Sequence, residues 1–296
     1  MSGDLRAALA AERPLQVVGV INAYAAVQAR SAGFRAIYLS GAGVANAGFA
    51  LPDLAMTGLG DVLEDTRRIT GAVPLPLLVD ADTGWGEGLT IGRTARELAR
   101  AGAAAMHLED QVQTKRCGHR GGKQLVAADL MQERIAAAAD GRPDERFVVM
   151  ARTDALAVEG LESAVERCGR YVEAGADMIF FEGATALEQF GRVADAARVP
   201  VLANITEFGK TPLWTREQLA AAGVALVLYP LSGFRAMAKA AAGVFETIRR
   251  DGTQRETITQ MQTRAELYET LDYERYEARA DAILARADQG RNGNRG

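Results

Sequence analysis

In EAGADMIFFE, residues 173–182, an Ala-Gly pair precedes a short apolar run that ends in a carboxylate. A glycine such as Gly175 commonly ends a helix in the left-handed conformation. The apolar run after it is typical of a strand buried in a parallel sheet. The same arrangement recurs in SAGFRAIYLS (residues 31–40), RAGAAAMHLED (100–110) and AAGVALVLYP (221–230), so the chain repeats a helix–strand unit.

Adding the apolar runs that lack the glycine gives eight predicted strands: Gln16–Asn22, Ala36–Ser40, Leu75–Asp82, Ala104–Glu109, Phe147–Thr153, Asp177–Glu182, Val199–Asn204 and Val224–Tyr229. Apolar residues at helical spacing predict helices between them, at Asp61–Thr70, Thr90–Ala101, Ala128–Ala139, Gly160–Ala174 and Thr185–Arg198. Eight strands alternating with helices over roughly 250 residues are typical of an α/β fold, the TIM-type (β/α)8 barrel. A doubly wound sheet is the alternative, but it normally has fewer strands and a nucleotide-binding turn after the first.

No linker divides the chain, so we expect one barrel domain over residues 1–296 with a C-terminal helical extension over 233–288. Two further helices are predicted in the extension, Ser232–Arg250 and Glu256–Ala287. The second helix packs either on its own barrel or on a neighbouring subunit, and its periodicity does not choose between the two. Residues 289–296 are expected to form a disordered tail.

Composition excludes several classes of protein. The chain has 34 Lys and Arg against 38 Asp and Glu, a net charge of −4, which argues against a nucleic-acid-binding face. The 48% of hydrophobic residues excludes general disorder. The longest apolar run, Ala220–Leu231, is too short to cross a membrane, and the N-terminal sequence lacks the apolar core of a signal peptide. Two cysteines form no disulfide framework, so a cytoplasmic protein is expected.

Polar residues follow the predicted strands at their carboxyl ends. They are Asn22, Ser40, Asp80, Asp82, Glu109, Arg152, Glu182 and Asn204. In a barrel of this kind the active site lies at that rim. We therefore expect these side chains to meet in one functional site.

Asp80 and Asp82 are two residues apart, so on a strand their side chains face the same way. Two neighbouring carboxylates repel each other, and a divalent cation removes the conflict. Oxygen ligands without a set of histidines favour Mg²⁺, or Mn²⁺, over zinc. Glu109 and Glu182 are expected to support the ion through water. The alternative is that Arg152 pairs with the aspartates.

The longest loop, residues 110–129, carries the most reactive side chains. Lys115, Arg116, His119 and Arg120 are potential cations around Cys117, and three glycines accompany them. Such a setting lowers a thiol pKa. It also attracts a small substrate with two or three carboxylates, toward which Cys117 would act as a general acid or base. A solvated basic loop is the alternative, and a structural zinc site lacks the ligands it needs.

Two other kinds of chemistry are disfavoured. The glycine-rich stretch GAGVANAG (residues 41–48) misplaces the third glycine of a dinucleotide-binding turn. Its small residues instead allow backbone N–H groups to approach a carboxylate. No predicted strand contains or ends in lysine, which disfavours a Schiff base.

The motifs together resemble a known family. KRCGH (residues 115–119) is similar to the signature of the isocitrate lyase and phosphoenolpyruvate mutase superfamily. With YLSGAG, LPDLA, LVDADTGWG, HLEDQ, MARTDALAVEGLE, LANITEFGKTP, LYPLSGFRAM and MQTRAELYE, the chain from about Leu5 to about Ala287 resembles the 2-methylisocitrate lyases. KRCGH is also found in isocitrate lyases, so it identifies the branch and not the substrate.

The resemblance implies Mg²⁺-dependent cleavage of 2-methylisocitrate to pyruvate and succinate, a step of the methylcitrate route of propionate catabolism, in a homotetramer that exchanges a C-terminal helix. It implies metal binding by Asp80 and Asp82 and catalysis by Cys117, with His119 beside it. The base is left open between Tyr38 and water-linked Glu109. The substrate contacts that it implies are Ser40, Gly41, Ala42, Cys117, Gly118, Arg152, Glu182, Asn204, Ile205, Thr206, Arg235 and Arg264.

Other readings remain open at this stage. The substrate is alternatively isocitrate, oxaloacetate or a dimethylmalate, because Ala42, Phe181 and the pair Gly121-Gly122 depart from the family pattern. Phosphonate chemistry is disfavoured because those relatives lack the Cys-Gly-His loop. A non-catalytic carboxylate-binding protein is disfavoured by the intact set of residues at the strand ends.

Overall fold

The computed structural model describes residues 3–116, 118 and 121–293, with side chains as far as residue 286. The chain divides into two compact units, Met1–Ala236 and Met237–Gly296. Each unit is described by itself.

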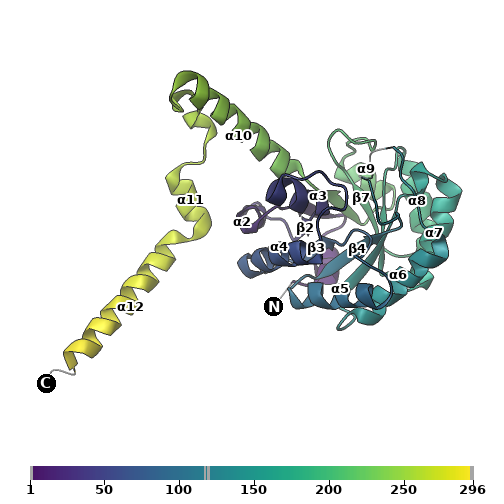
Figure 1. Ribbon diagram of the computed structural model, residues 1–296, viewed down its shortest axis with the longest axis horizontal. Coiled ribbons are helices and arrows are strands. Elements are labelled where there is room, and N and C mark those ends of the chain that lie inside the picture. Colours follow the sequence, from purple (N-terminus) through teal and green to yellow (C-terminus); the bar gives the residue numbers. More distant parts are fainter. Residues whose placement is uncertain (1–2, 117, 119–120, 294–296) are drawn as a thin grey trace. The chain divides into compact units, whose positions relative to one another are not determined.

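The first unit is a closed barrel of eight parallel strands in sequential order, which confirms the predicted (β/α)8 fold (Figure 1). The strands are β1 (Leu15–Gly19), β2 (Ala36–Leu39), β3 (Leu77–Asp80), β4 (Ala105–Glu109), β5 (Val148–Thr153), β6 (Met178–Phe181), β7 (Val201–Asn204) and β8 (Leu226–Tyr229). Closure is direct: Val17 of β1 pairs with Ala36 of β2 on one side and with Leu228 of β8 on the other.

Helices surround the strands. They are α1 (Leu5–Ala11), α2 (Ala23–Ser31), α3 (Gly41–Gly43), α4 (Leu59–Ala72), α5 (Leu89–Arg100), α6 (Ala128–Gly141), α7 (Leu161–Glu173), α8 (Leu187–Ala197) and α9 (Arg216–Ala221). After β8, α10 (Ser232–Asp251) begins in the first unit and continues into the second. A π-helix, Val44–Gly48, follows α3, and a 3₁₀ turn, Ala155–Ala157, follows β5. Gly33, Gly102, Gly175 and Gly223 all have φ between +82° and +107° after a helix, as the repeated Ala-Gly pairs predict.

Strand alternation divides the buried apolar residues into two cores. In β6, Met178 and Phe180 belong to the core inside the barrel, whereas Ile179 and Phe181 belong to the core between strands and helices. The inner core also takes Leu5 of α1, which is fully buried. One end of the barrel is therefore filled with apolar side chains.

The predicted strands are right in number and order but too long. Leu75–Asp82 and Val199–Asn204 begin two residues early, because Leu75 and Val199 are apolar but each precedes a proline that comes before the strand. Asn22 is not among the residues that line the cavity at the carboxyl ends of the strands. It caps α2, where its Oδ1 accepts a hydrogen bond from the Ala25 N–H at 2.8 Å.

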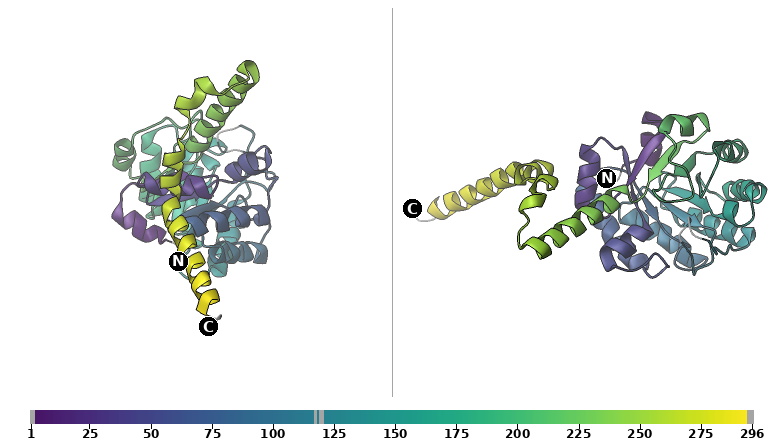
Figure 2. Two further views of the ribbon diagram at one scale, coloured as in Figure 1. Left: turned by 90° about the vertical axis from the view of Figure 1, so that its left-hand side faces the viewer. Right: turned by 90° about the horizontal axis from the view of Figure 1, so that it is seen from above.

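The predicted helix over 256–287 is wrong. The second unit instead contains a 3₁₀ helix (Arg255–Gln260), α11 (Arg264–Leu271) and α12 (Tyr273–Gly293), drawn in yellow-green to yellow in Figure 2. Asp272 separates the last two because its φ is +54°, which a continuous helix does not allow. In the part of the chain that the structure describes, every helix is too short or too polar to span a lipid bilayer.

Candidate active site

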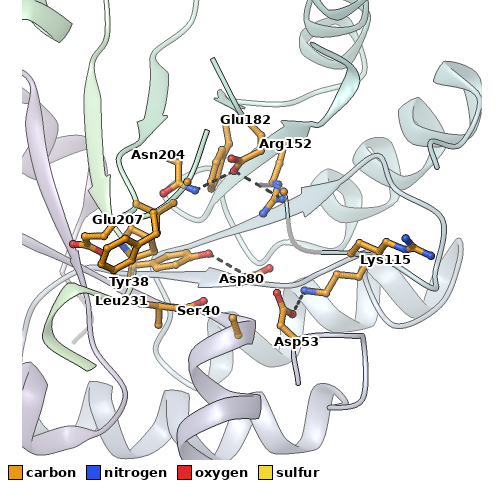
Figure 3. A pocket seen from close by; sticks show the side chains of 18 of the residues that line it. Tyr38, Ser40, Asp53, Asp80, Lys115, Arg152, Glu182, Asn204, Glu207 and Leu231 are labelled. Atoms are coloured by element: carbon orange, nitrogen blue, oxygen red, sulfur yellow. Dashed lines mark hydrogen bonds and ion pairs between the residues drawn. The ribbon is translucent and has the colours of Figure 1, made fainter. Parts of the chain in front are cut away.

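A cavity of about 240 Å³ lies at the carboxyl ends of the strands (Figure 3). Its walls are formed by residues that follow or end β2, β3, β5, β6 and β7, together with the loop after β4 and the start of α10. They are Tyr38, Ser40, Ala42, Asp53, Asp80, Lys115, Arg116, Gly118, Arg152, Phe180, Glu182, Asn204, Thr206, Glu207, Phe208, Gly209, Pro230, Leu231 and Arg235.

Tyr38 of β2 links two buried ionisable groups. Its Oη lies 2.9 Å from His107 Nε2 and donates to Asp80 Oδ2 at 3.2 Å. Burial lowers the pKa of His107 to about 4, so its ring is neutral at pH 7. Burial, followed by the charge of Asp80, raises the pKa of Tyr38 well above its ordinary value. Tyr38 therefore keeps its proton and points it at Asp80.

The two aspartates converge, but not by strand alternation. Asp80 ends β3, whereas Asp82 lies beyond the strand with φ of +47°. The Asp82 N–H donates to Asp80 Oδ1 at 3.0 Å, and the Gly41 N–H donates to Asp80 Oδ2 at 3.0 Å. A Cβ on Gly41 would stand 3.1 Å from Asp82 Oδ1 and 3.2 Å from Asp80 Oδ2. Gly41 thus lets the backbone approach both carboxylates, as the small residues of its stretch suggest.

The two carboxylates titrate differently. Burial, then the charge of Asp80, raises the pKa of Asp82 to about 6. Burial also opposes ionisation of Asp80, but His107, Lys115 and Arg152 outweigh it and hold that pKa well below its usual range. The Lys115 ammonium lies 2.7 Å from Asp82 Oδ1 and 2.5 Å from Asp53 Oδ1. This corner of the cavity therefore stabilises positive charge.

The chemistry of these donors fits a magnesium ion. Among the described residues, no three His, Cys, Asp or Glu side chains are placed to hold a metal together. Mg²⁺, however, usually takes one or two carboxylates and keeps several waters. Asp80 and Asp82 supply such a pair, and the position of the Lys115 ammonium shows that a cation is favoured beside it.

Arg152 of β5 also lines the cavity, and among the described residues its ion pairs are with carboxylates other than Asp80 and Asp82. Its guanidinium lies 3.4 Å from Glu109 Oε2, 3.0 Å from Asp154 Oδ2 and 3.9 Å from Glu182 Oε2. Glu182 Oε2 also accepts a hydrogen bond from Asn204 Nδ2 at 3.0 Å. The expected alternative, in which Arg152 neutralises Asp80 and Asp82, is not the arrangement observed.

Glu109, at the end of β4, is fully buried behind the cavity wall. Neither of its carboxylate oxygens has a hydrogen-bond partner among the described residues. Burial raises its pKa well above the ordinary value, although Arg152 opposes the shift. Burial therefore favours the neutral form of this carboxyl group.

The loop after β4 is closed at its base by an antiparallel bridge between Gln111 and Leu125. Gly118 comes so close to the opposite wall that a Cβ there would stand 2.6 Å from Arg152 Nη2 and 2.7 Å from Glu182 Cδ. A side chain at this position would require Arg152 or Glu182 to move. The predicted catalytic residues Cys117 and His119 lie outside the described residues.

The remaining predicted contacts fall in different places. Ser40, Ala42, Thr206 and Arg235 line the cavity, and Arg235 Nε lies 3.7 Å from Glu207 Oε2. Ile205 is buried in the outer core and is not among the lining residues. Arg264 begins α11 in the second unit, where its side chain is exposed.

Sequence reasoning missed several lining residues, among them Asp53, Phe180, Glu207 and Leu231. Asp53 lies in LPDLA, a motif of the resemblance, but no strand end marks it. The sequence pointed to Phe181, which departs from the family pattern, and not to Phe180. The Phe181 ring instead packs edge-on against Phe190 in the outer core, with 5.7 Å between the ring centroids.

Comparison with known protein families assigns the chain to one of them. The family model described as phosphoenolpyruvate phosphomutase matches residues 5–249, and the chain belongs to this family of enzymes. A 2-methylisocitrate lyase from Salmonella typhimurium (strain LT2) is 57% identical over 279 residues, covering 94% of this chain and 95% of that protein. A 2-methylisocitrate lyase from Escherichia coli (strain K12) is 55% identical, with 95% and 96% covered.

Solved structures of related enzymes have the same fold. A crystal structure of 2,3-dimethylmalate lyase, a member of the PEP mutase/isocitrate lyase superfamily, matches with a TM-score of 0.86 at 36% identity, covering 94% of each chain. Oxaloacetate acetylhydrolase with 3,3-difluorooxalacetate matches with a TM-score of 0.87 at 32% identity, covering 95% of this chain and 96% of that one. The predicted resemblance to the superfamily is confirmed, and with it the assignment of the chain as an enzyme whose curated relatives are carbon–carbon lyases.

Proposed function

We propose that the protein cleaves 2-methylisocitrate to pyruvate and succinate. The observation that carries the proposal is a cavity lined by Asp80, beside which Asp82 lies, and by the Arg152 guanidinium. A substrate with carboxylates at both ends needs one cationic partner at each. The identity of 57% over nearly the full length of a 2-methylisocitrate lyase supports the choice of substrate.

We propose that Asp80 and Asp82 hold Mg²⁺, or Mn²⁺, which when bound would polarise the hydroxyl and carboxylate at the pyruvate end of the substrate. Around that end, Ser40, Gly41 and Ala42 position the carboxylate. Tyr38 holds its proton on Asp80, so that Asp80 stays oriented by two hydrogen bonds, from Tyr38 Oη and the Gly41 N–H.

The bond between C2 and C3 breaks when a base removes the hydroxyl proton, and the electron pair stays on the succinate carbon. The candidate bases are Glu109, acting through water, and Tyr38; the Arg152 guanidinium, 3.4 Å from Glu109 Oε2, favours the charged carboxylate that a base needs. Arg152, with Arg235 at the cavity edge, stabilises the charge that builds on the succinate end. Glu182, Asn204 and Thr206 orient the same end.

We propose that Cys117, with His119 nearby in sequence, protonates the succinate carbon. Gly118 supports this assignment, since its close approach to Arg152 and Glu182 brings the residue next to Cys117 against the wall where the succinate end would lie.

We also propose that the working protein is a homotetramer in which the C-terminal extension packs on a neighbouring copy. Large apolar side chains on the second unit support this. Phe245 is 68% exposed, Tyr276 62% and Leu284 64%. The oligomer size is measured by light scattering after gel filtration, and a monomer at micromolar concentration would contradict the proposal.

The function is tested by incubating purified protein and Mg²⁺ with 2-methylisocitrate, isocitrate, a 2,3-dimethylmalate or oxaloacetate in separate reactions. Pyruvate release from 2-methylisocitrate that stops with EDTA supports both the substrate and the metal. Glyoxylate from isocitrate, or turnover of dimethylmalate or oxaloacetate in its place, would reassign the substrate within the superfamily. No turnover of any of the four would overturn the proposed lyase activity.

The two cysteines provide a matched test of the acid. Cys117→Ser is expected to lower turnover by about 10³-fold, because a hydroxyl is a far weaker acid at this position. Cys168→Ser is the control, since Cys168 is fully buried in α7 and burial raises its pKa far above that of an ordinary thiol. It should lose stability but keep turnover per folded molecule. Full activity in Cys117→Ser would rule out the proposed role.

A further inference from the structure

A buried carboxylate outside the reacting groups connects to the backbone on both sides of position 117. Asp154 follows β5 and is fully buried. Its Oδ1 accepts a hydrogen bond from Lys123 Nζ at 2.6 Å, and its Oδ2 accepts one from Gln111 Nε2 at 3.4 Å. Lys123 and Gln111 lie at opposite ends of the loop after β4.

Each of these two side chains in turn holds one side of the loop. Gln111 forms a matched pair with the backbone of Arg116: its Nε2 donates to Arg116 O at 2.9 Å, and its Oε1 accepts from Arg116 N at 3.0 Å. Lys123 Nζ donates to Gly118 O at 2.6 Å. Arg116 and Gly118 both line the cavity, so their positions shape its wall.

Asp154 is itself held rigidly. Its backbone N–H donates to Asp110 Oδ1 at 2.9 Å, and Asp110 Oδ2 accepts from Thr153 Oγ1 at 2.7 Å and from Tyr171 Oη at 2.9 Å. Arg152 Nε donates to Asp154 Oδ2 at 3.0 Å, which joins the same carboxylate to the cavity. The Lys123 and Asp154 side chains are 2% and 0% exposed, so their pairing is screened little by solvent.

We propose that Asp154, Lys123 and Gln111 form a clamp that positions Arg116 in the cavity wall and Gly118 against Arg152, and that Asp154 and Lys123 are positioning residues for the reaction. A buried charged pair is a poor source of stability when compared with apolar residues. The Lys123–Asp154 pair is instead explained by its role in the clamp, which holds the main chain on both sides of the proposed acid. The inference rests on the proposed function for its kinetic readout alone.

The first test reads the clamp without any substrate. Native protein is digested with trypsin, and the rate of cleavage after Arg116 is followed by mass spectrometry. Asp154→Asn, which keeps the shape of the side chain but removes its charge, should speed this cleavage by about tenfold or more, because local opening governs native-state proteolysis. Lys123→Met should do the same, and Lys123→Arg should restore slow cleavage.

Asp177→Asn is the matched control. Asp177 precedes β6 at the opposite end of the barrel and accepts from Arg142 Nη1 at 2.7 Å and from the Val149 N–H at 2.9 Å. Its loss should leave cleavage after Arg116 within about twofold of the wild type, since distant sites act independently. Equal acceleration in Asp154→Asn and Asp177→Asn, or faster cleavage at all sites alike, would overturn the clamp.

The second test uses the pyruvate assay. Asp154→Asn and Lys123→Met should lower kcat per folded molecule by about 10²-fold, the usual cost of a misplaced catalytic wall, and Lys123→Arg should recover most of it. Unchanged kcat in both variants would overturn the positioning role. If the wild type releases no pyruvate, the proposed function fails while the trypsin experiment still decides the clamp. If Asp154→Asn does not fold, Lys123→Met and Lys123→Arg carry both measurements.

Discussion

The two ends of the barrel bury different kinds of side chain. At the amino ends of the strands, α1 closes the barrel with Leu5 and Leu9, and the side chains behind them are apolar. At the carboxyl ends, the side chains of Asp80, Glu109 and Arg152 are also buried, yet each of them is ionisable. Burial stabilises the protein at the first end and opposes ionisation at the second. The buried ionisable groups, whose charged forms burial disfavours, are therefore concentrated where the chemistry is proposed.

Arg152→Lys should produce the largest effect and affects only the charged end. Lysine keeps the charge but loses the planar fork that reaches Glu109, Asp154 and Glu182 together. We expect kcat to fall by about 10²–10³-fold, the usual cost of losing one preorganised donor. The pyruvate assay measures this, with Arg142→Lys at the amino end as the control. Equal falls in kcat in Arg152→Lys and Arg142→Lys would show that the two ends of the barrel do not differ in this respect.

Leu5→Ala should affect only the apolar end. Leu5 is fully buried, and removing its side chain should lower the free energy of unfolding by about 2–5 kcal/mol. Denaturant titration measures the loss, and Leu213→Ala, at a side chain 65% exposed, is the control. Turnover per folded molecule should not change. A fall in kcat would show that the two ends are coupled.

Asp82→Asn should stabilise the metal-free protein, in contrast to Leu5→Ala. The pKa of Asp82 is raised from 3.8 to about 6 by burial and by Asp80, so the folded protein binds this proton more tightly than the unfolded chain. The stability that Asp82 contributes is complete below pH 3.8 and is lost as the pH rises through about 6. At pH 7 in EDTA, Asp82→Asn should therefore raise the free energy of unfolding by about 1–3 kcal/mol.

The stability of the same variant should also depend on pH differently from that of the wild type. Asparagine tolerates the left-handed backbone at this position, so the change is one of charge. Denaturation curves of Asp82→Asn and the wild type should converge toward pH 4 and separate toward pH 7, and Mg²⁺ should stabilise only the wild type. A variant less stable than the wild type at pH 7 in EDTA would contradict the view that burial disfavours charged groups at this end.

Arg6→Ala should have the smallest effect. Arg6 Nη2 lies 2.7 Å from Asp177 Oδ1 at the amino end, but the Arg6 side chain is 43% exposed. Solvent screens such a pair, and the expected loss is about 0–1 kcal/mol. Thermal unfolding measures it, and added salt should reduce it further. A loss above that range would mean that charge also matters at the apolar end.

The fold followed from the sequence because its signals are local. Each strand is a short apolar run, and glycines such as Gly175 mark the helix ends. The strand ends were harder to place, since the apolar residues before Pro76 and Pro200 look like strand but lie outside the ladder. The break at Asp272 was missed because apolar spacing continues through it, and no glycine or proline marks the left-handed residue.

The site was predictable only as far as strand ends reveal it. Asp80, Arg152, Glu182 and Asn204 were found because they end strands and therefore face one cavity. Asp82 was assigned to the site by strand alternation, but this rule does not apply to Asp82, which lies beyond the end of β3. Contacts between loops, such as Lys115 with Asp53, depend on tertiary structure and leave no periodic signal in the sequence.

The bridge between Gln111 and Leu125 has a consequence for how such enzymes diversify. It fixes the two ends of the intervening segment at the spacing of paired strands, whatever lies between them. Positions of the segment other than Arg116, Gly118, Lys123 and the proposed acid can therefore vary without altering the register of β4 and β5. A barrel with a bridged insertion can acquire new substrates by replacing such residues while every strand of the scaffold stays as it was.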